Sequence, residues 1–150
     1  GGVYLAKTGL DDAVAAAKKM PCDTWLVEDL IEGALAELLI GVVKDPAHGF
    51  VLTLAAGGVL TELLEDSVSM LVPATEDEIE AALGKLRIFK MISGFRGARA
   101  ASQTAVVEAI KSVQDYVVAH AEGLEEVEIN PLICTAEHAI AVDALIRRKD

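Results

Sequence analysis

Towards its end the sequence runs Glu126-Val127-Glu128-Ile129-Asn130-Pro131-Leu132 and, after the polar residues Thr135-Ala136-Glu137-His138, continues as Ala141-Val142-Asp143-Ala144. Apolar and polar residues alternate in the first segment, as they do in a strand with two different faces. Apolar residues continue on both sides of the polar residues, from Ile133 before them to Ile146 after them. This pattern predicts an antiparallel hairpin.

The register of this hairpin brings oxygen ligands together. If the reversal is centred on Ala136-Glu137, Asn130 lies opposite Asp143, and Glu128 shares their face. Ile133 and Ile140 then pair on the other, apolar side. Two carboxylates and an amide suit Mg²⁺, which binds one or two carboxylates together with substrate phosphates. The same spacing also fits a strand with a solvated face that ends in an Asn-Pro turn.

Composition excludes several classes of protein. Thirteen basic and 24 acidic residues give a net charge of −11 in 150 residues, so we expect no nucleic-acid partner. The most apolar window, Trp25 to Val43, contains four acidic residues, which excludes an ordinary membrane-spanning helix. Cys22 and Cys134 are far apart and form no zinc-binding pattern. With no signal peptide visible, we expect a cytoplasmic protein with reduced thiols, and the abrupt opening at Gly1 suggests an excised segment.

The remaining pattern predicts an α+β fold, in which hairpin strands are covered by helices. Thr75-Glu76-Asp77-Glu78 is a capping box that begins one helix, and apolar residues at helical spacing predict another from about Ser102 to Ala121. An earlier helix, from Ala13 to Met20, is expected to be capped by Asp11 or Asp12. The expected strands are 3–5, 24–27, 36–43, 50–54, 59–64 and 68–72.

Three further segments are candidate ligand sites. Paired glycines in Ala55-Ala56-Gly57-Gly58 allow backbone N–H groups to approach a ligand, although a tight turn explains them equally well. Gly84 to Val107 contains no acidic residue but five basic ones, among them Arg96 in Gly94-Phe95-Arg96-Gly97. That segment suits an anion or a solvated connection between helices. Glu28-Asp29-Leu30-Ile31-Glu32-Gly33, with Glu37 beyond it, suits either a hinge between two lobes or a solvated loop.

Taken in order, these segments resemble the ATP-grasp region of the NDP-forming acyl-CoA synthetases and the nucleotide-binding subunit of succinyl-CoA synthetase. The similar parts are the acidic hinge, the glycine pair with Glu62, the Phe-Arg-Gly loop and the Glu-x-Asn segment. Ala55 stands where the family usually has glycine, and Phe95 where it has tyrosine. The resemblance implies most of an ATP-grasp domain, with the end of the small lid lobe at 1–27 and the larger C-terminal lobe at 28–150.

The resemblance also implies an acid–thiol ligase. Such an enzyme converts a carboxylic acid, CoA and ATP to acyl-CoA, ADP and phosphate through an acyl phosphate and a phosphohistidine. Asn130, Asp143 and Glu128 would hold Mg²⁺, and Glu128 would alternatively meet the incoming histidine. Arg96 would assist phosphoryl transfer. The nucleotide, ATP or ADP, would be bound by the residues that match the hinge and the glycine pair, namely Glu28, Asp29, Leu30, Glu37, Gly57 and Gly58.

The implied partner is a CoA-binding, phosphohistidine-bearing domain on the same chain or on another subunit, in an oligomeric full-length enzyme. By itself the segment is expected to be inactive, because the lysine expected from the lid lobe would precede Gly1. A rival from another class is a non-catalytic regulatory or ligand-sensing module fused to a protein acetyltransferase. The third alternative is a purely structural acidic α+β domain.

Overall fold

The computed structural model describes residues 3–4, 9–57 and 66–149 of the chain. These residues divide into two compact units, unit 1 from Gly1 to Glu32 and unit 2 from Gly33 to Asp150. The predicted boundary between lobes, at 27/28, falls within five residues of this division. Within the described ranges, no helix has both the length and the apolar character needed to cross a membrane.

Unit 1 contains one described helix, α1 (Leu10–Ala17), whose N-cap is Gly9. The prediction of Asp11 or Asp12 as the cap was therefore wrong, and both acids lie in the first helical turn instead. The strand predicted at 24–27 is absent, since residues 24–35 have no regular secondary structure. Leu26 and Val27 are largely exposed. A strand needs a neighbour for its hydrogen bonds, and the apolar run by itself does not supply one.

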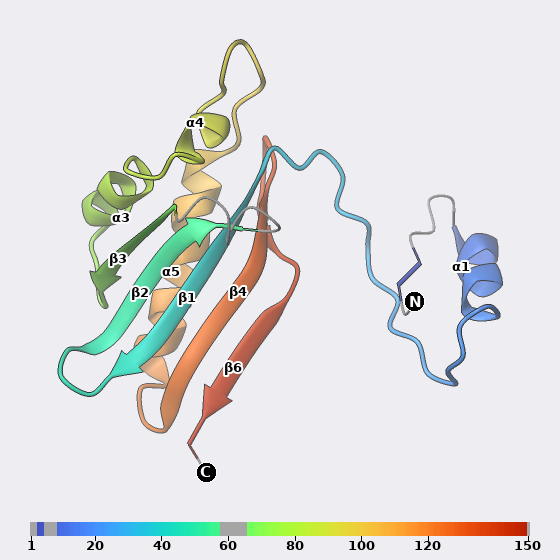
Figure 1. Ribbon diagram of the computed structural model, residues 1–150, viewed down its shortest axis with the longest axis horizontal. Helices are drawn as coiled ribbons and strands as arrows, with labels where there is room; N and C mark the ends of the chain where they lie inside the picture. The colour runs from blue at the N-terminus through green and yellow to red at the C-terminus, as the bar shows by residue number, and fades with distance from the viewer. Residues whose placement is uncertain (1–2, 5–8, 58–65, 150) are drawn as a thin grey trace. The chain divides into compact units, whose positions relative to one another are not determined.

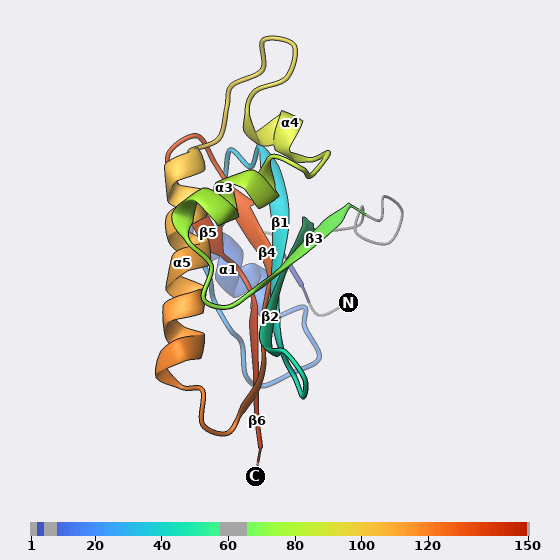
Figure 2. The same ribbon diagram turned by 90° about the vertical axis from the view of Figure 1, so that its left-hand side faces the viewer.

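Unit 2 is an antiparallel sheet with helices packed on one face (Figures 1 and 2). Its strand order is β3-β2-β1-β4-β5, and β6 also pairs with β4. The strands are β1 (Ala36–Asp45), β2 (Gly49–Ala56), β3 (Ser67–Leu71), β4 (Leu124–Cys134), β5 (Ala139–Ala141) and β6 (Ala144–Arg148). The helices are α3 (Glu76–Leu83), α4 (Phe89–Ile92) and α5 (Gln103–Ala119). The predicted α+β class is confirmed. The strand predicted at 59–64 lies outside the described residues.

The hairpin of β1 and β2 forms as the sequence predicts. Pairs run from Leu38↔Ala56 to Asp45↔Gly49. In the turn, one oxygen of Asp45 accepts hydrogen bonds from the backbone N–H groups of Ala47 and His48, both at 2.8 Å. Gly49 has a φ of 81°, a conformation that favours glycine. The geometry of this turn therefore explains the Asp-Pro-Ala-His-Gly sequence.

The core lies between the sheet and the helices. Along β1, Leu38, Ile40 and Val42 are fully buried and alternate with less buried residues. Val106 and Ile110 of α5 are fully buried on the facing helix, as the predicted stripe requires. We call this side of the sheet the helix face. The predicted capping box of Thr75 and Glu78 also forms, and Ser102 caps α5.

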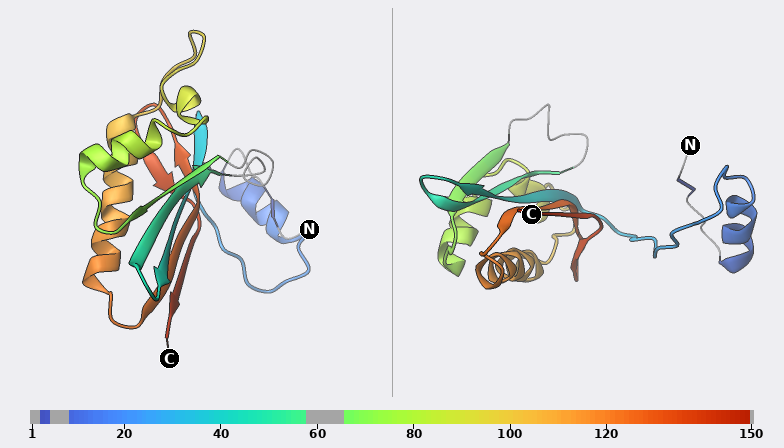
Figure 3. Two further views of the ribbon diagram at one scale, coloured as in Figure 1. Left: turned by 60° about the vertical axis from the view of Figure 1, so that its left-hand side comes forward. Right: turned by 90° about the horizontal axis from the view of Figure 1, so that it is seen from below.

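The opposite side of the sheet carries Glu37, Gly41, Thr53, Glu128 and Asn130, and we call it the open face. In the described part of unit 2, no helix lies on this side (Figure 3). Side chains of paired residues in neighbouring strands lie on the same side of a sheet. The pairs Gly41↔Thr53 and Gly41↔Glu128 therefore make a continuous row across β2, β1 and β4.

Candidate functional site

The hairpin register predicted for the candidate metal ligands is confirmed. Ile133 pairs with Ile140, and the backbone N–H of Asn130 donates to the carbonyl oxygen of Asp143 at 3.3 Å. Asn130 of β4 and Asp143, which lies between β5 and β6, are thus direct neighbours. Glu128 lies two residues before Asn130, and its Oε1 accepts a hydrogen bond from Asn130 Nδ2 at 3.4 Å. Glu128 and Asn130 are therefore in contact through their side chains, and Asp143 is joined to Asn130 through the backbone.

A bulge at Asn130-Pro131 shapes this place. Leu38 pairs with Leu132 and Ile40 with Ile129, so two residues of β4 face the single residue Leu39 of β1. Proline has no N–H to give to a ladder, which favours such an irregularity. The partner strand is interrupted at the same level, between β5 and β6. The one strand predicted from Ile140 to Ile146 is therefore two short ones.

Because of the bulge, two residues lie on a different face of the sheet from the one predicted. Before it, Val127 and Ile129 are buried, and after it the buried residues are Leu132 and Cys134. Ile133 lies between these two and is only partly buried, so the alternation places it and its partner Ile140 on the open face. The prediction that they form an apolar side opposite the ligands was wrong, because the extra residue reverses the alternation.

The charges around the ligands leave them available to a cation. Neither Glu128 nor Asp143 forms an ion pair within the described residues, whereas the neighbouring Glu126 binds Arg147 at 3.2 Å. One oxygen of Asp143 accepts from the backbone N–H of Ala144 at 2.8 Å. The Asn130 amide turns its nitrogen toward Glu128, which leaves Oδ1 for a metal.

The chemistry of this donor set fits Mg²⁺. Two carboxylates supply two negative charges, and the partly buried amide adds a neutral oxygen. Within the described ranges, no group of three or more His, Cys, Asp and Glu side chains is arranged to hold a metal ion. The candidate set has only two such residues. It is therefore an incomplete shell of the kind in which substrate phosphates and water supply the remaining ligands.

Glu37 and Gly57 meet at the start of β1. The backbone N–H of Gly57 donates to the carbonyl oxygen of Glu37 at 2.7 Å. A Cβ on Gly57 would lie 2.9 Å from the carbonyl carbon of Leu38, so the close approach of the two backbones requires glycine. This contact gives Gly57 a packing role, and donation to a ligand would require the bond to open. Gly58 and Glu62 lie outside the described residues.

The acidic segment of Glu28, Asp29 and Leu30 belongs to unit 1 and is exposed. It has no regular secondary structure, and Gly33 beyond it has a φ of 74°. The hinge predicted at this segment stays a prediction. The predicted contacts of these residues with a nucleotide stay predictions.

Arg96 lies in an exposed loop between α4 and α5. It has a φ of 52°, which is uncommon for a residue other than glycine. Its guanidinium lies 5.1 Å from the centre of the Phe95 ring, a cation–π arrangement. Gly94 and Gly97 also have positive φ angles, and a Cβ on Gly94 would lie 2.8 Å from the carbonyl oxygen of Ala98. The loop geometry explains both glycines, and the role of Arg96 stays a prediction.

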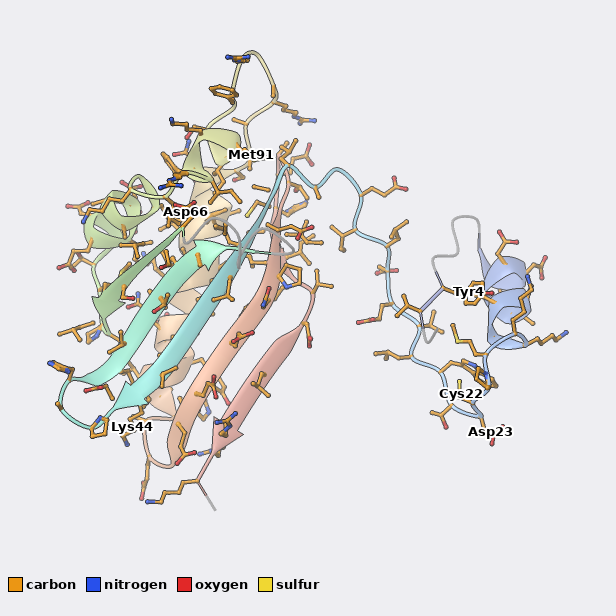
Figure 4. All side chains as sticks on the ribbon, viewed as in Figure 1. Tyr4, Cys22, Asp23, Lys44, Asp66 and Met91 are labelled. Carbon is orange, nitrogen blue, oxygen red and sulfur yellow. The ribbon has the colours of Figure 1, made fainter. Side chains whose placement is uncertain are left out.

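Sequence reasoning missed Asp66, which Figure 4 labels beside the start of β3. Its side chain is buried, and its two oxygens accept the backbone N–H groups of Arg87 at 2.7 Å and Ile88 at 2.8 Å. Asp66 therefore ties the segment before α4 to the edge of the sheet. Its acceptors are satisfied by the fold, which makes it a structural residue.

An apolar groove lies on the helix face, between α5 and strands β4 to β6. This groove has a volume of about 310 Å³ and no charged residue in its lining. Ala109 and Tyr116 line it from the helix, and Ile129 and Ile146 from the strands. It is separate from the ligands on the open face, because the sheet lies between them.

His48, His120 and His138 are exposed, and the two cysteines differ in burial. Cys134 is fully buried, and this burial raises the pKa of its thiol to about 12, whereas Cys22 is exposed. A thiol with so high a pKa is a packing residue.

Comparison with known proteins agrees with this arrangement. The family described as ATP-grasp domain matches residues 5–147, nearly the whole chain. The chain belongs to the ATP-grasp domain family. This membership confirms the fold that the ordered motifs implied, while the assignment of the two lobes to 1–27 and 28–150 stays a prediction.

Several relatives of this ATP-grasp domain are CoA ligases. The chain is 29% identical over 112 residues to the beta subunit of acetate–CoA ligase (ADP-forming) II of Pyrococcus furiosus, covering 73% of this chain and 48% of that protein. It is 28% identical over 127 residues to 4-hydroxybutyrate–CoA ligase (ADP-forming) of Nitrosopumilus maritimus, covering 85% of this chain and 18% of that protein. The chain therefore spans about half the length, or less, of the curated relatives that it matches.

A solved structure supports the same relationship. An acetyl-coenzyme A synthetase 1 from Ca. Korarchaeum cryptofilum, in complex with coenzyme A and Mg-AMPPCP, superposes with a TM-score of 0.72. It is 28% identical in sequence, and the match covers 80% of this chain and 55% of that one. The likeness extends over most of the ATP-grasp domain described here.

Proposed function

We propose that this chain is the nucleotide-binding part of an NDP-forming acyl-CoA synthetase. The whole enzyme would convert a carboxylic acid, CoA and ATP to acyl-CoA, ADP and phosphate. One observation carries the proposal: the sheet register sets Asp143 beside Asn130 and Glu128, and neither carboxylate forms an ion pair among the described residues. Relatives with this activity, and a similar structure whose complex includes Mg-AMPPCP, support it.

In the proposed site, Asn130 Oδ1 and the Asp143 carboxylate hold Mg²⁺ on the open face. When bound, the metal neutralises charge on the nucleotide phosphates, which is a large part of catalysis of phosphoryl transfer. Glu128 orients the Asn130 amide through the bond at 3.4 Å. It either completes the metal shell or receives the histidine of a partner domain. The protein contributes mainly by positioning these groups.

The other predicted residues have proposed roles around this centre. Glu28, Asp29 and Leu30 would contact the adenine and ribose, and Glu37, at the start of β1, would also take part in nucleotide binding. Gly57 and Gly58 flank the phosphates at the end of β2. Arg96 supplies a planar, permanently charged donor to a phosphoryl group from a loop that glycines make possible. The positive φ of Arg96 supports a functional reading, because uncommon backbone conformations are concentrated at functional sites.

The proposed enzyme needs partners. A CoA-binding, phosphohistidine-bearing domain would belong to the same chain or to a second subunit, and the full-length enzyme would be an oligomer in the cytoplasm. The name of the P. furiosus relative as a beta subunit and the coenzyme A in the similar structure support this organisation. The rival, a regulatory module attached to an acetyltransferase, receives no support from these relatives, and the presence of Glu128, Asn130 and Asp143 argues against a degenerate site.

Calorimetric titration with Mg-ADP tests the proposal. We expect the chain to bind ADP in the presence of Mg²⁺ and to lose affinity when EDTA removes the metal. Asn130→Ala and Asp143→Ala each remove one oxygen ligand and should weaken binding at least about tenfold, equivalent to about 1.4 kcal/mol. Glu126→Ala is the matched control, since it removes a carboxylate of the same strand that is already paired with Arg147. Equal affinity in all four proteins would remove the metal assignment.

A further inference from the structure

Gly41 occupies a central position on the open face. It lies in the middle of β1, the strand between β2 and β4. Its Cα partners are Thr53 on one side and Glu128 on the other. Strands in a sheet lie about 4.8 Å apart, so Gly41 is the immediate neighbour of the proposed metal ligand Glu128.

The fold gives no reason for a glycine at this position. Gly41 is not among the described glycines with a positive φ. A Cβ built on it would meet only Leu39 Cδ2, at 3.5 Å, which is an ordinary contact. Gly57 differs, because its backbone lies too close to Leu38 for any side chain. Glycine weakens the interior of a strand, so its presence often marks a place where a ligand or another backbone approaches closely.

The neighbours of Gly41 are polar on both sides. The hydroxyl groups of Thr53 and Ser69 lie 2.9 Å apart on β2 and β3. On β4, Glu128 and Asn130 are joined at 3.4 Å. At Gly41 the surface of β1 is therefore backbone without a side chain of that residue. It lies between a pair of hydroxyl groups on one side and the proposed metal ligands on the other.

We infer that Gly41 is a clearance residue, which keeps the surface of β1 low so that the metal-bound phosphates of the nucleotide can lie across it. This inference rests on the proposed function. In the proposed site Mg²⁺ would lie beside Glu128, and a phosphate oxygen bound to it would be about 2.1 Å from the metal. The phosphate chain must then occupy space next to Glu128. On the β1 side, the lack of a side chain at residue 41 leaves room next to Leu39.

The inference makes an unusual prediction, in which one substitution has opposite effects on stability and on binding. Valine is favoured in strands and glycine is not, so Gly41→Val should leave the melting temperature unchanged or raise it. Its branched side chain would fill the space above β1, and affinity for Mg-ADP should fall at least about tenfold. Gly41→Ala adds only a methyl group and should have a smaller effect, roughly threefold or less.

Leu71→Phe is the matched control. Leu71 is an exposed residue of β3 that pairs with Val51, and it lies on the same face, two strands from β1. The substitution enlarges an open-face side chain away from Glu128, by less than valine adds at position 41. We expect its affinity for Mg-ADP to stay within about twofold of the wild type.

Calorimetric titration of Mg-ADP into the four proteins, together with their melting temperatures, separates the outcomes. Loss of binding by Gly41→Val with an unchanged or raised melting temperature supports the inference. Wild-type affinity in Gly41→Val overturns the inference while leaving the proposed function intact. A fall in melting temperature with Gly41→Val and Gly41→Ala would make the glycine structural and would also overturn it. If the wild type itself does not bind Mg-ADP, the proposed function fails and the inference fails with it.

Discussion

Replacing Asp66 with alanine should destabilise unit 2 substantially, although this residue was not identifiable from the sequence. The residue is 7% exposed, and its carboxylate accepts hydrogen bonds from the backbone N–H groups of Arg87 and Ile88. A hydrogen bond to a charged group contributes about 1.5–3 kcal/mol, and a buried donor left without a partner costs about 1–3 kcal/mol. Ile88 is buried, whereas the exposed Arg87 can recover a bond to water. We therefore expect a loss of about 2–4 kcal/mol in the free energy of unfolding.

Urea denaturation followed by circular dichroism measures this loss, with an unchanged dependence on urea concentration as the check on two-state behaviour. Asp66→Asn keeps the shape but only one acceptor oxygen and should lose about half as much. Asp115→Ala, at an exposed position of α5, should change stability by less than about 0.5 kcal/mol. A loss below about 0.5 kcal/mol for Asp66→Ala would show that Asp66 does not hold the segment before α4 in place.

Three further predictions concern single side chains. Hydrogen bonds from Thr75 lower the pKa of Glu78 below its ordinary value of 4.5, so its contribution to stability is complete above that value and is lost as the pH falls through the lowered pKa. The melting temperature of Glu78→Gln should therefore lie below that of the wild type near neutral pH and converge with it in acid; a gap that persists in acid would contradict this. At about pH 8, Ellman's reagent should react quickly with Cys22 and not with Cys134, whose buried thiol has a pKa of about 12, until the protein is unfolded; fast reaction of both thiols would refute the described core. In the full-length enzyme, Arg96→Ala should lower turnover more than about tenfold while leaving the melting temperature unchanged, and a matching loss of both would make Arg96 structural.

The candidate site was predictable because its residues are close in sequence and joined by a short reversal. The polar residues 135–138 fix the centre of the hairpin, and the register of Asn130 with Asp143 follows from it. The face of Ile133 was not predictable in the same way. A bulge adds one residue to one strand, and the alternation of apolar and polar residues does not reveal where that extra residue lies.

The failures elsewhere have a common physical origin in long-range contacts. The segment 24–27 has residues that favour a strand, yet a strand depends on a partner that local sequence does not specify. Asp66 precedes a strand, as many turn acids do, and its partners Arg87 and Ile88 lie 21 and 22 residues away. Gly41 looks like an ordinary interruption of an apolar strand until the pairing places it beside Glu128. In each case the outcome depends on tertiary contacts that the local sequence does not specify.

The central claim is that the open face beside Glu128, Asn130 and Asp143 holds the metal of a bound nucleotide. Mn²⁺ accepts the same oxygen ligands as Mg²⁺ and broadens the NMR signals of nearby amides, so Mn-ADP reports the position of the metal directly. We predict that the strongest broadening, compared with Mg-ADP, falls on the amides of Gly41, Asn130 and Asp143. The amides of α5, on the other side of the sheet, should be affected least. Strongest broadening at the turn after Asp45, or at Glu28 and Asp29 in unit 1, would contradict the claim.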